Sequence, residues 1–305
     1  MVRAAGVRIG WRDLPSGVRQ RVEAIVGGRV TEAVSQPGGF SPGTADRVRT
    51  ADGRRAFVKA VTPAINPRSA DLARQELTIT AALPAHAPVP RMLGGFDDGD
   101  WVVLVLEDIE GTHPRTPWEA HEIDVAVTTL RELAAALTPA PPVDVPSAAD
   151  SLAGDFASWE RLAGDPPADL DPWTAAHLPD LVAATATGLA SVATGNTLAH
   201  CDIRADNILV RPDGRMIVVD WPWACVGPPW LDAVLLGIEV LARGGDPERM
   251  TSGVDPEAVT GLYAGFAGAF RHMSRLPPPP GIPTVRAFQR WQADALIAWL
   301  RGRLG

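Results

Sequence analysis

Alternating apolar and polar positions in the first third of the chain predict a small antiparallel β-sheet. Helical periodicity begins at Asp13, a predicted N-cap, and ends near Val26, and a second helix is predicted from Pro67 to about Leu83. Asp52-Gly53 is a hairpin turn signal. Strands are predicted where apolar and β-branched residues recur at every second position, near residues 29–36, 46–51, 54–61, 91–95 and 101–106.

The pattern changes beyond residue 112 to long stretches with helical periodicity that are rich in Ala, Leu and Trp. One β-like interruption covers residues 198–220, where two short apolar runs flank a turn. Helices are expected near residues 117–137, 150–162, 174–194, 229–243, 255–272 and 284–302.

Together the two patterns predict an α+β protein with two lobes. Residues 1–110 would form a small antiparallel-sheet lobe, and residues 111–305 a larger, mainly helical lobe. The break at residues 107–111 is the expected hinge. Within the helical lobe, the proline run at residues 277–280 indicates a rigid connector.

The composition is that of a globular protein with a sizeable core, since 46% of the 305 residues are hydrophobic and 21% are charged. The first residues interleave arginines with apolar positions and show no signal-peptide pattern, and the longest apolar runs are too short to span a bilayer. Cys201 and Cys225 are too few for a disulfide framework or a zinc site, and Cys201 is expected to pack as a small apolar side chain. We therefore expect a cytoplasmic protein with no membrane partner.

The net charge of −8 is unevenly distributed: residues 1–111 carry +1 and residues 112–305 carry −9. Nucleic-acid binding needs a basic surface, so this balance argues against a nucleic-acid partner. The acidic second part is compatible with a cationic substrate and equally with a surface that only maintains solubility. The sequence leaves the oligomeric state open.

Lysine occurs once in the chain, at Lys59, although Lys and Arg together number 28. Lys59 lies in the third predicted strand, where a kinase needs the cation that reaches the α- and β-phosphates of its nucleotide. Glu76 falls in the middle of the following helix, in a place to hold Lys59 in an ion pair. The alternative for Glu76 is a solvated helix face.

A Gly-rich turn joins the first two predicted strands. Gly38, Gly39 and Gly43 would let the backbone approach phosphates closely, with Ser41 as a further candidate contact. Because no helix follows, the turn is neither a Walker A loop nor a dinucleotide fingerprint. A Gly/Pro hairpin without a ligand is the alternative.

The most specific chemical signal is His200-x-Asp202-x4-Asn207, followed by Asp220 after an apolar strand. Asp202 would orient and deprotonate an acceptor hydroxyl. Asn207 and Asp220 offer the hard oxygen ligands that suit Mg²⁺. The apolar runs between these two residues predict a hairpin that brings them to the same end.

In these motifs the chain resembles the aminoglycoside phosphotransferase family, the small-molecule branch of the protein-kinase-like fold. The sequence of residues 200–207 resembles that family's catalytic loop, and that of residues 218–221 its metal-binding segment. The stretch from Gly227 to Asp232 resembles a Gly-Pro-x-x-x-Asp segment whose Asp ties a helix start to the catalytic loop. No Ala-Pro-Glu motif follows, which argues against protein substrates.

The resemblance implies the same roles for the candidates above and adds two more. The adenine of a bound nucleotide would hydrogen-bond to the hinge backbone around Glu107 and Ile109. Arg204, two residues after Asp202, would face the transferred phosphate; the alternative is a surface arginine. ATP and Mg²⁺ are the expected cofactors, and GTP is left open.

We therefore expect an ATP-dependent O-phosphotransferase that moves the γ-phosphate to a hydroxyl of a small, amino-bearing molecule, such as an aminoglycoside, another antibiotic or an amino sugar. One alternative is a metabolic kinase of a neutral sugar, amino alcohol or macrolide. Another is a nucleotide-binding pseudokinase, although Lys59, Asp202, Asn207 and Asp220 are all present. Antibiotic resistance and primary metabolism stay open as roles.

Overall fold

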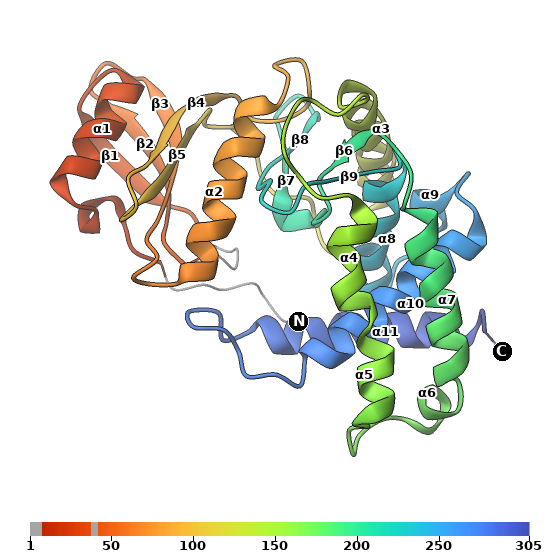
Figure 1. Ribbon diagram of the computed structural model, residues 1–305. Helices are drawn as coiled ribbons and strands as arrows, with labels where there is room; N and C mark the ends of the chain where they lie inside the picture. Colours follow the sequence, from red (N-terminus) through yellow and green to blue (C-terminus); the bar gives the residue numbers. More distant parts are fainter. Residues whose placement is uncertain (1–7, 38–41, 305) are drawn as a thin grey trace.

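A sheet-containing part and a mainly helical part lie side by side in the protein (Figure 1). Figure 1 is a computed structural model of the chain, and it describes residues 8–37 and 42–304. The predicted α+β class is confirmed. Within the described ranges, no helix has both the length and the apolar character needed to cross a membrane.

Five strands form the sheet of the first part, in the order β1-β2-β3-β5-β4. Each neighbouring pair is antiparallel, and the turn between β2 and β3 contains Gly53 at a φ of 85°, as the Asp-Gly signal predicts. The strands are β1 Val30–Ser35, β2 Thr44–Thr50, β3 Arg55–Val61, β4 Met92–Asp97 and β5 Val102–Leu106.

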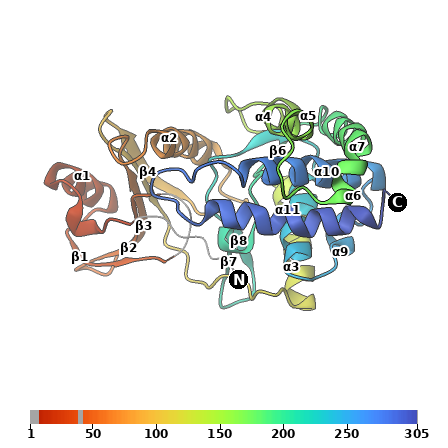
Figure 2. The same ribbon diagram turned by 90° about the horizontal axis from the view of Figure 1, so that it is seen from below.

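Helices α1 (Ser16–Val26) and α2 (Pro67–Ala82) cover opposite faces of this sheet (Figure 2). Ala56, Val58 and Ala60 of β3 pack in the apolar cluster that contains α1, whereas Val61 packs in the cluster that contains α2. Since side chains alternate along a strand, Lys59 shares the α2 side with Val61.

Helix α1 begins later than predicted. A short 3-10 turn, Trp11–Asp13, precedes it, and the Asp13 side chain accepts a hydrogen bond from the Gly10 N–H at 2.7 Å. Because Asp13 caps this turn, the prediction that it caps α1 is wrong. The backbone N–H of Arg19 instead donates to the Pro15 carbonyl at the start of α1.

The second part is built from helices α3 to α11. Two of the predicted helices are each divided in two, at Ala157 and at His177, where the backbone leaves helical geometry. The short α9 was not predicted. The bounds are α3 Ala120–Ala136, α4 Ala148–Phe156, α5 Ser158–Gly164, α6 Pro172–Ala176, α7 Leu178–Ser191, α8 Leu231–Ala242, α9 Glu248–Thr251, α10 Pro256–Met273 and α11 Val285–Arg301.

The core of the helical part centres on α10, which packs closely against α7. A Cβ atom at Gly188 would collide with the backbone of Gly261, so glycine at both positions lets the two helices touch. Trp159 is fully buried beside them, and its indole N–H donates to the Ala264 carbonyl at 2.8 Å.

Two small antiparallel sheets lie between the helices and the first part. Strand β6 (Thr197–Ala199) pairs with β9 (Cys225–Gly227), and β7 (Ile208–Val210) pairs with β8 (Met216–Val218). The predicted β-like interruption is thus confirmed as a hairpin, β7–β8, framed by β6 and β9.

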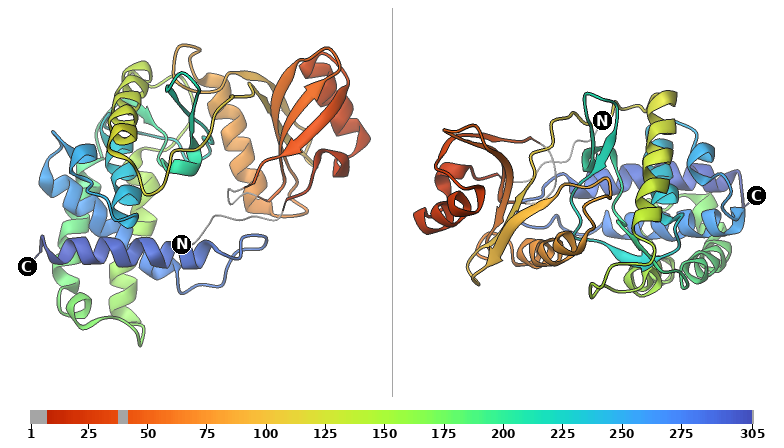
Figure 3. Two further views of the ribbon diagram at one scale, coloured as in Figure 1. Left: turned by 180° about the vertical axis from the view of Figure 1, so that it is seen from behind. Right: turned by 90° about the horizontal axis from the view of Figure 1, so that it is seen from above.

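The segment between α10 and α11 reaches across to the first part (Figure 3). Asn66 caps α2 by accepting the Ser69 N–H at 3.0 Å, and its amide donates to the Pro280 carbonyl at 2.9 Å. Gly281 lies against Pro42, where an added Cβ would come within 3.3 Å of the Pro42 ring. The proline-rich connector therefore contacts both the start of α2 and the arm of the Gly-rich turn.

Candidate active site

Lys59, Glu76 and Asp220 meet between the two parts of the molecule. Lys59 Nζ lies 2.7 Å from Glu76 Oε1 and 2.6 Å from Asp220 Oδ1. Glu76 is only 4% exposed, so it does not belong to a solvated helix face. Burial alone would lower the pKa of Lys59, but the two carboxylates raise it above its ordinary value. Burial opposes ionisation of Asp220 as well, yet the ammonium holds the pKa of this carboxyl below its usual value.

Asn207 and Asp220 lie at the same end of the β7–β8 hairpin, where the spacing predicted them. The Val219 N–H donates to the Asn207 carbonyl at 2.9 Å and closes this end. The Asn207 side-chain amide donates to the main-chain and carboxylate oxygens of Asp202, at 2.8 and 3.1 Å. Its own side-chain oxygen therefore points away from Asp202.

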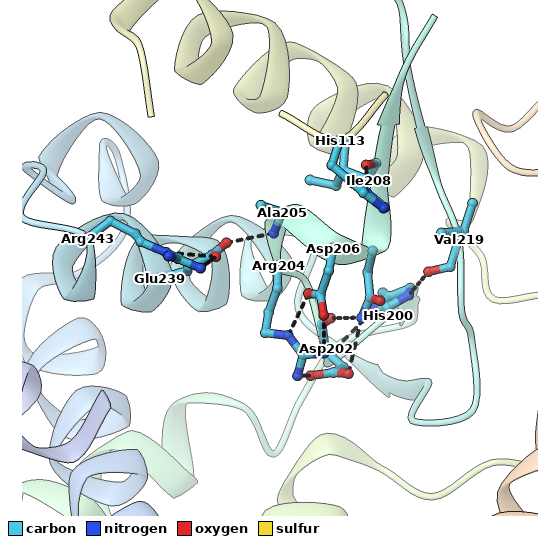
Figure 4. Close-up of polar contacts among 11 residues, drawn as sticks. His113, His200, Asp202, Arg204, Ala205, Asp206, Ile208, Val219, Glu239 and Arg243 are labelled. Atoms are coloured by element: carbon cyan, nitrogen blue, oxygen red, sulfur yellow. Dashed lines mark hydrogen bonds and ion pairs between the residues drawn. The ribbon is translucent and has the colours of Figure 1, made fainter. Parts of the chain in front are cut away.

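His200 braces the loop of residues 200–207, which we call the catalytic loop (Figure 4). The ring is fully buried; Nε2 donates to the Val219 carbonyl at 3.0 Å, and Nδ1 accepts the Asp202 N–H at 3.2 Å. One ring nitrogen donates while the other accepts, so the imidazole is neutral. The pKa of His200 also favours the neutral form, because burial lowers it to about 4. The brace fixes the backbone that bears Asp202.

Asp202 and Asp206 share one guanidinium. Arg204 Nη1 lies 2.9 Å from Asp202 Oδ1, and Arg204 Nε lies 2.9 Å from Asp206 Oδ1 (Figure 4). Burial raises the pKa of Asp202 to about 7, although Arg204 and the Asn207 amide oppose the rise. A carboxyl group that titrates near neutrality is suited to accept a proton from a hydroxyl. The Arg204 side chain is 16% exposed and lies 5.6 Å from the ring centre of Phe288 on α11, so it is not a surface arginine.

Asp232, in the first turn of α8, ties that helix to the catalytic loop. Its two carboxylate oxygens accept the N–H groups of His200 and Cys201, at 2.8 and 2.9 Å. This is the connection that the Gly-Pro-x-x-x-Asp resemblance implies. Burial raises the pKa of Asp232 to about 6.

Glu239 lies further along α8 than Asp232 and was not singled out from the sequence. It is buried, accepts the Ala205 N–H at 2.6 Å and pairs with Arg243 at 3.2 Å (Figure 4). A lone acid within the apolar run of residues 233–242 is the signal that could have found it, because acidic residues are rarely buried without a partner. Two carboxylates of α8, those of Asp232 and Glu239, therefore accept hydrogen bonds from the backbone of the catalytic loop.

Cys201 and Cys225 form a disulfide, so the expectation that Cys201 packs as a separate apolar side chain is wrong. The physical reason is the pairing of β6 with β9, which places Ala199 opposite Cys225. Cys201 lies two residues after the end of β6, and its Cα lies 6.7 Å from that of Cys225. The two cysteines are 24 positions apart, and their spacing gives no sign of this return of the chain.

Glu107 and Ile109 follow β5 and connect the two parts. The Glu107 N–H donates to the Arg91 carbonyl at 2.9 Å, and the Ile109 carbonyl accepts from the Arg47 guanidinium. These two backbone groups are engaged within the protein. The predicted adenine contacts therefore narrow to the Glu107 carbonyl and the Ile109 N–H.

Gly38, Gly39 and Ser41 lie outside the described residues, and their contacts with a nucleotide stay predictions. Gly43, on the returning arm of the turn, has a φ of 135°, and a Cβ there would lie 2.6 Å from the Ala60 carbonyl oxygen. Only glycine fits this position without displacing β3. The arm therefore runs directly beside the strand that carries Lys59.

A family model, described as the phosphotransferase enzyme family, matches residues 38–250, which include Lys59, residues 200–207 and Asp220. The chain belongs to this phosphotransferase family. Membership confirms the predicted enzyme class, a small-molecule phosphotransferase, without specifying the acceptor. A search of curated proteins finds no match to this phosphotransferase.

Solved structures share the fold of this phosphotransferase at low sequence identity. An aminoglycoside phosphotransferase from Alicyclobacillus acidocaldarius is 15% identical, with a TM-score of 0.57 over 90% of this chain and 92% of that one. The choline kinase LicA from Streptococcus pneumoniae is 15% identical, with a TM-score of 0.61 over 93% and 98%. A thermostable mutant of the aminoglycoside phosphotransferase APH(4)-Ia, in a ternary complex with AMP-PNP and hygromycin B, is 14% identical, with a TM-score of 0.63 over 95% and 100%. The predicted protein-kinase-like fold is confirmed.

Proposed function

We propose that this phosphotransferase transfers the γ-phosphate of ATP to a hydroxyl group of a small, amino-bearing acceptor. The proposal rests on one arrangement: Lys59 is held between Glu76 and Asp220, beside a loop in which the pKa of Asp202 is raised to about 7. Phosphoryl transfer needs a placed cation for the phosphates and an oriented hydroxyl, with little covalent chemistry by the protein.

Lys59 is the phosphate-binding cation in this proposal. Glu76 fixes the ammonium on the α2 side, and a polyphosphate chain would compete with Asp220 for it. At the hinge, the adenine amino group would donate to the Glu107 carbonyl, and a ring nitrogen would accept the Ile109 N–H. Guanine carries an oxygen in place of that amino group, so two acceptors would face each other at Glu107. We therefore infer a preference for ATP over GTP.

Asn207 and Asp220 would hold Mg²⁺. Both carry hard oxygen donors at one end of the hairpin, and Asp220 already attracts a cation, since Lys59 Nζ lies 2.6 Å from it. In the part of the chain that the structure describes, no three His, Cys, Asp or Glu side chains assemble into a metal cage. This fits Mg²⁺, which is usually held by one or two protein ligands and completed by phosphate oxygens and water. When bound, the ion would neutralise charge on the phosphates.

Asp202 would accept the proton of the acceptor hydroxyl. His200 and Asn207 hold its backbone and carboxylate in place through the hydrogen bonds described above. Arg204 lies against the same carboxylate, so a hydroxyl bound to Asp202 would receive the phosphoryl group next to a guanidinium. Arg204 would stabilise the charge of that group during transfer.

The charge of the catalytic loop favours an amino-bearing acceptor. Arg204 is shared between Asp202 and Asp206, so these three side chains keep a net negative charge when both acids are ionised. Residues 112–305 as a whole carry −9. Among proteins of the same fold, one is a choline kinase and another is bound to hygromycin B.

A panel assay tests the proposal and identifies the acceptor. ADP release would be measured with aminoglycosides, amino sugars, amino alcohols including choline, neutral sugars and macrolides. We expect acceptor-dependent release by the wild type with an amino-bearing compound. Asp213→Ala should match the wild type, because Asp213 is an exposed carboxylate in the turn of the same hairpin. Turnover with neutral compounds alone would refute the acceptor class. Nucleotide binding without turnover on any acceptor would favour the pseudokinase alternative.

A further inference from the structure

One disulfide bond joins the two ends of the segment that carries three of the proposed functional residues. The Cys201–Cys225 disulfide closes a ring of backbone that contains Asp202, Asn207 and Asp220. Cys201 directly precedes the proposed base, and Cys225 starts β9, which follows the proposed metal segment. The bond therefore holds together both ends of the segment that would do the catalysis.

The disulfide acts on a loop that other contacts already hold in an unusual conformation. Cys201 has a φ of 63°, in the left-handed region that non-glycine residues rarely adopt. Asp232 stabilises this conformation by accepting the Cys201 N–H at 2.9 Å. Cys225 is fixed through the register of β9 with β6. The bond thus links a strained loop position to a sheet position that is held independently.

We propose that Cys201 and Cys225 form a reversible thiol–disulfide modification site that locks the catalytic loop in its assembled geometry. In the disulfide form, Asp202, Asn207 and Arg204 have the mutual contacts described above. Reduction would leave the Asp232 anchor and the His200 brace in place, so the fold would persist while Asp202 gains freedom. The effect on turnover rests on the proposed function; the modification itself does not.

A small-molecule disulfide would be the oxidant that forms the Cys201–Cys225 bond. The Cys201 thiolate attacks one sulfur of that disulfide and expels a small thiol, leaving a mixed disulfide on Cys201. The Cys225 thiolate then attacks the Cys201 sulfur and expels the second small thiol. Two protein thiols are oxidised to one disulfide, and one small disulfide is reduced to two thiols; a small dithiol drives the reverse reaction. Cys201 is the entry point, because it is partly exposed while Cys225 is 1% exposed.

Thiol titration and thermal unfolding of the full chain test the site without an acceptor. After treatment with oxidised glutathione, the denatured protein should contain no titratable thiol, and after dithiothreitol it should contain two. The oxidised form should unfold at a temperature higher by about 5 °C or more, because the bond restricts the unfolded chain. Hydrogen exchange of residues 202–207 should be faster in the reduced form.

Single variants provide the matched controls. Cys201→Ser and Cys225→Ser should each behave like the reduced wild type in thermal unfolding and hydrogen exchange. With oxidised glutathione, Cys225→Ser should stop at the mixed disulfide on Cys201, and Cys201→Ser should keep its buried thiol. Once the panel has identified an acceptor, reduction of the disulfide should lower wild-type kcat by roughly tenfold and leave ATP affinity unchanged. Two thiols after oxidation, or equal hydrogen exchange in both forms, would overturn the proposal. A missing acceptor, with the exchange difference intact, would instead count against the proposed function.

Discussion

Lys59 and Asp220 form an ion pair of 2.6 Å although 161 positions separate them in the sequence. Lys59 belongs to the sheet of the first part, whereas Asp220 follows the β7–β8 hairpin of the second. Their side chains are 19% and 29% exposed, so the pair is largely shielded from water. The only lysine of the chain therefore lies where the two parts meet.

Replacing this lysine by arginine should impair the protein even though the charge is kept. A guanidinium is a broad planar fork, and the compact ammonium of Lys59 lies between two carboxylates. We expect Lys59→Arg to weaken ATP binding by roughly tenfold or more, measured by calorimetric titration. The reverse change in the middle of α2, Arg74→Lys, at a partly exposed side chain, is the matched control and should have no such effect. Full ATP affinity in Lys59→Arg would refute the role of Lys59.

Turnover should fall as the pH drops through about 7. Asp202 must be ionised to accept a proton, and burial raises its pKa to about 7, so the protonated, inactive form accumulates below that pH. The measurement is kcat/KM as a function of pH, with ATP affinity followed over the same range. A rate that is constant from about pH 8 down to about pH 5 would rule out Asp202 as the base.

Arg204→Ala should reduce turnover more than ATP affinity. The guanidinium contacts Asp202 and Asp206, whereas the proposed nucleotide contacts belong to other residues. Arg204 also lowers the pKa of Asp202, so its removal should move the acid limb of the pH profile to higher pH. Arg204→Lys keeps the positive charge, so its pH profile should shift less than that of Arg204→Ala. An unchanged kcat and an unshifted profile would return Arg204 to a structural role.

Asp232→Asn should destabilise the fold. Each carboxylate oxygen of Asp232 accepts one buried N–H group. In the variant, one of these two N–H groups would face the NH2 of the asparagine side chain instead of an oxygen. We expect a loss of about 2–4 kcal/mol in the free energy of unfolding, measured with urea. Asp180→Asn, an exposed acid in the first turn of α7, is the control and should change this value by less than about 0.5 kcal/mol. Equal stability of both variants would show that the anchor is dispensable.

Local sequence patterns were sufficient to locate the elements that bear the candidate residues. The alternation of β3 places Lys59 on the α2 side, and the runs around residues 208–218 predict the hairpin that brings Asn207 and Asp220 together. Both depend on periodicity and turn residues within a few positions, which a sequence shows directly. The Lys59–Asp220 contact follows only when these elements are combined with the family resemblance.

Contacts between distant segments could not be predicted in this way. The disulfide depends on β9 returning beside β6, and the Glu239 contact depends on how α8 lies under the catalytic loop. The division of a predicted helix at His177 does have a local signal, because Pro179 lies in the first turn of α7 and a proline does not fit inside a continuous helix. The return of β9 beside β6 and the packing of α8 have no such signal. These features are set by the assembled fold and leave little trace in any single stretch of the chain.

Formation of a phosphorylated acceptor by Asp202→Ala is the most direct measurement of the proposed chemistry. Product would be quantified by mass spectrometry with ATP and the acceptor identified by the panel, and ATP affinity would be measured on the same samples. We predict that Asp202→Ala binds ATP like the wild type and forms product about 10²- to 10⁴-fold more slowly. Product formation at the wild-type rate by Asp202→Ala would contradict the assignment of Asp202 as the base.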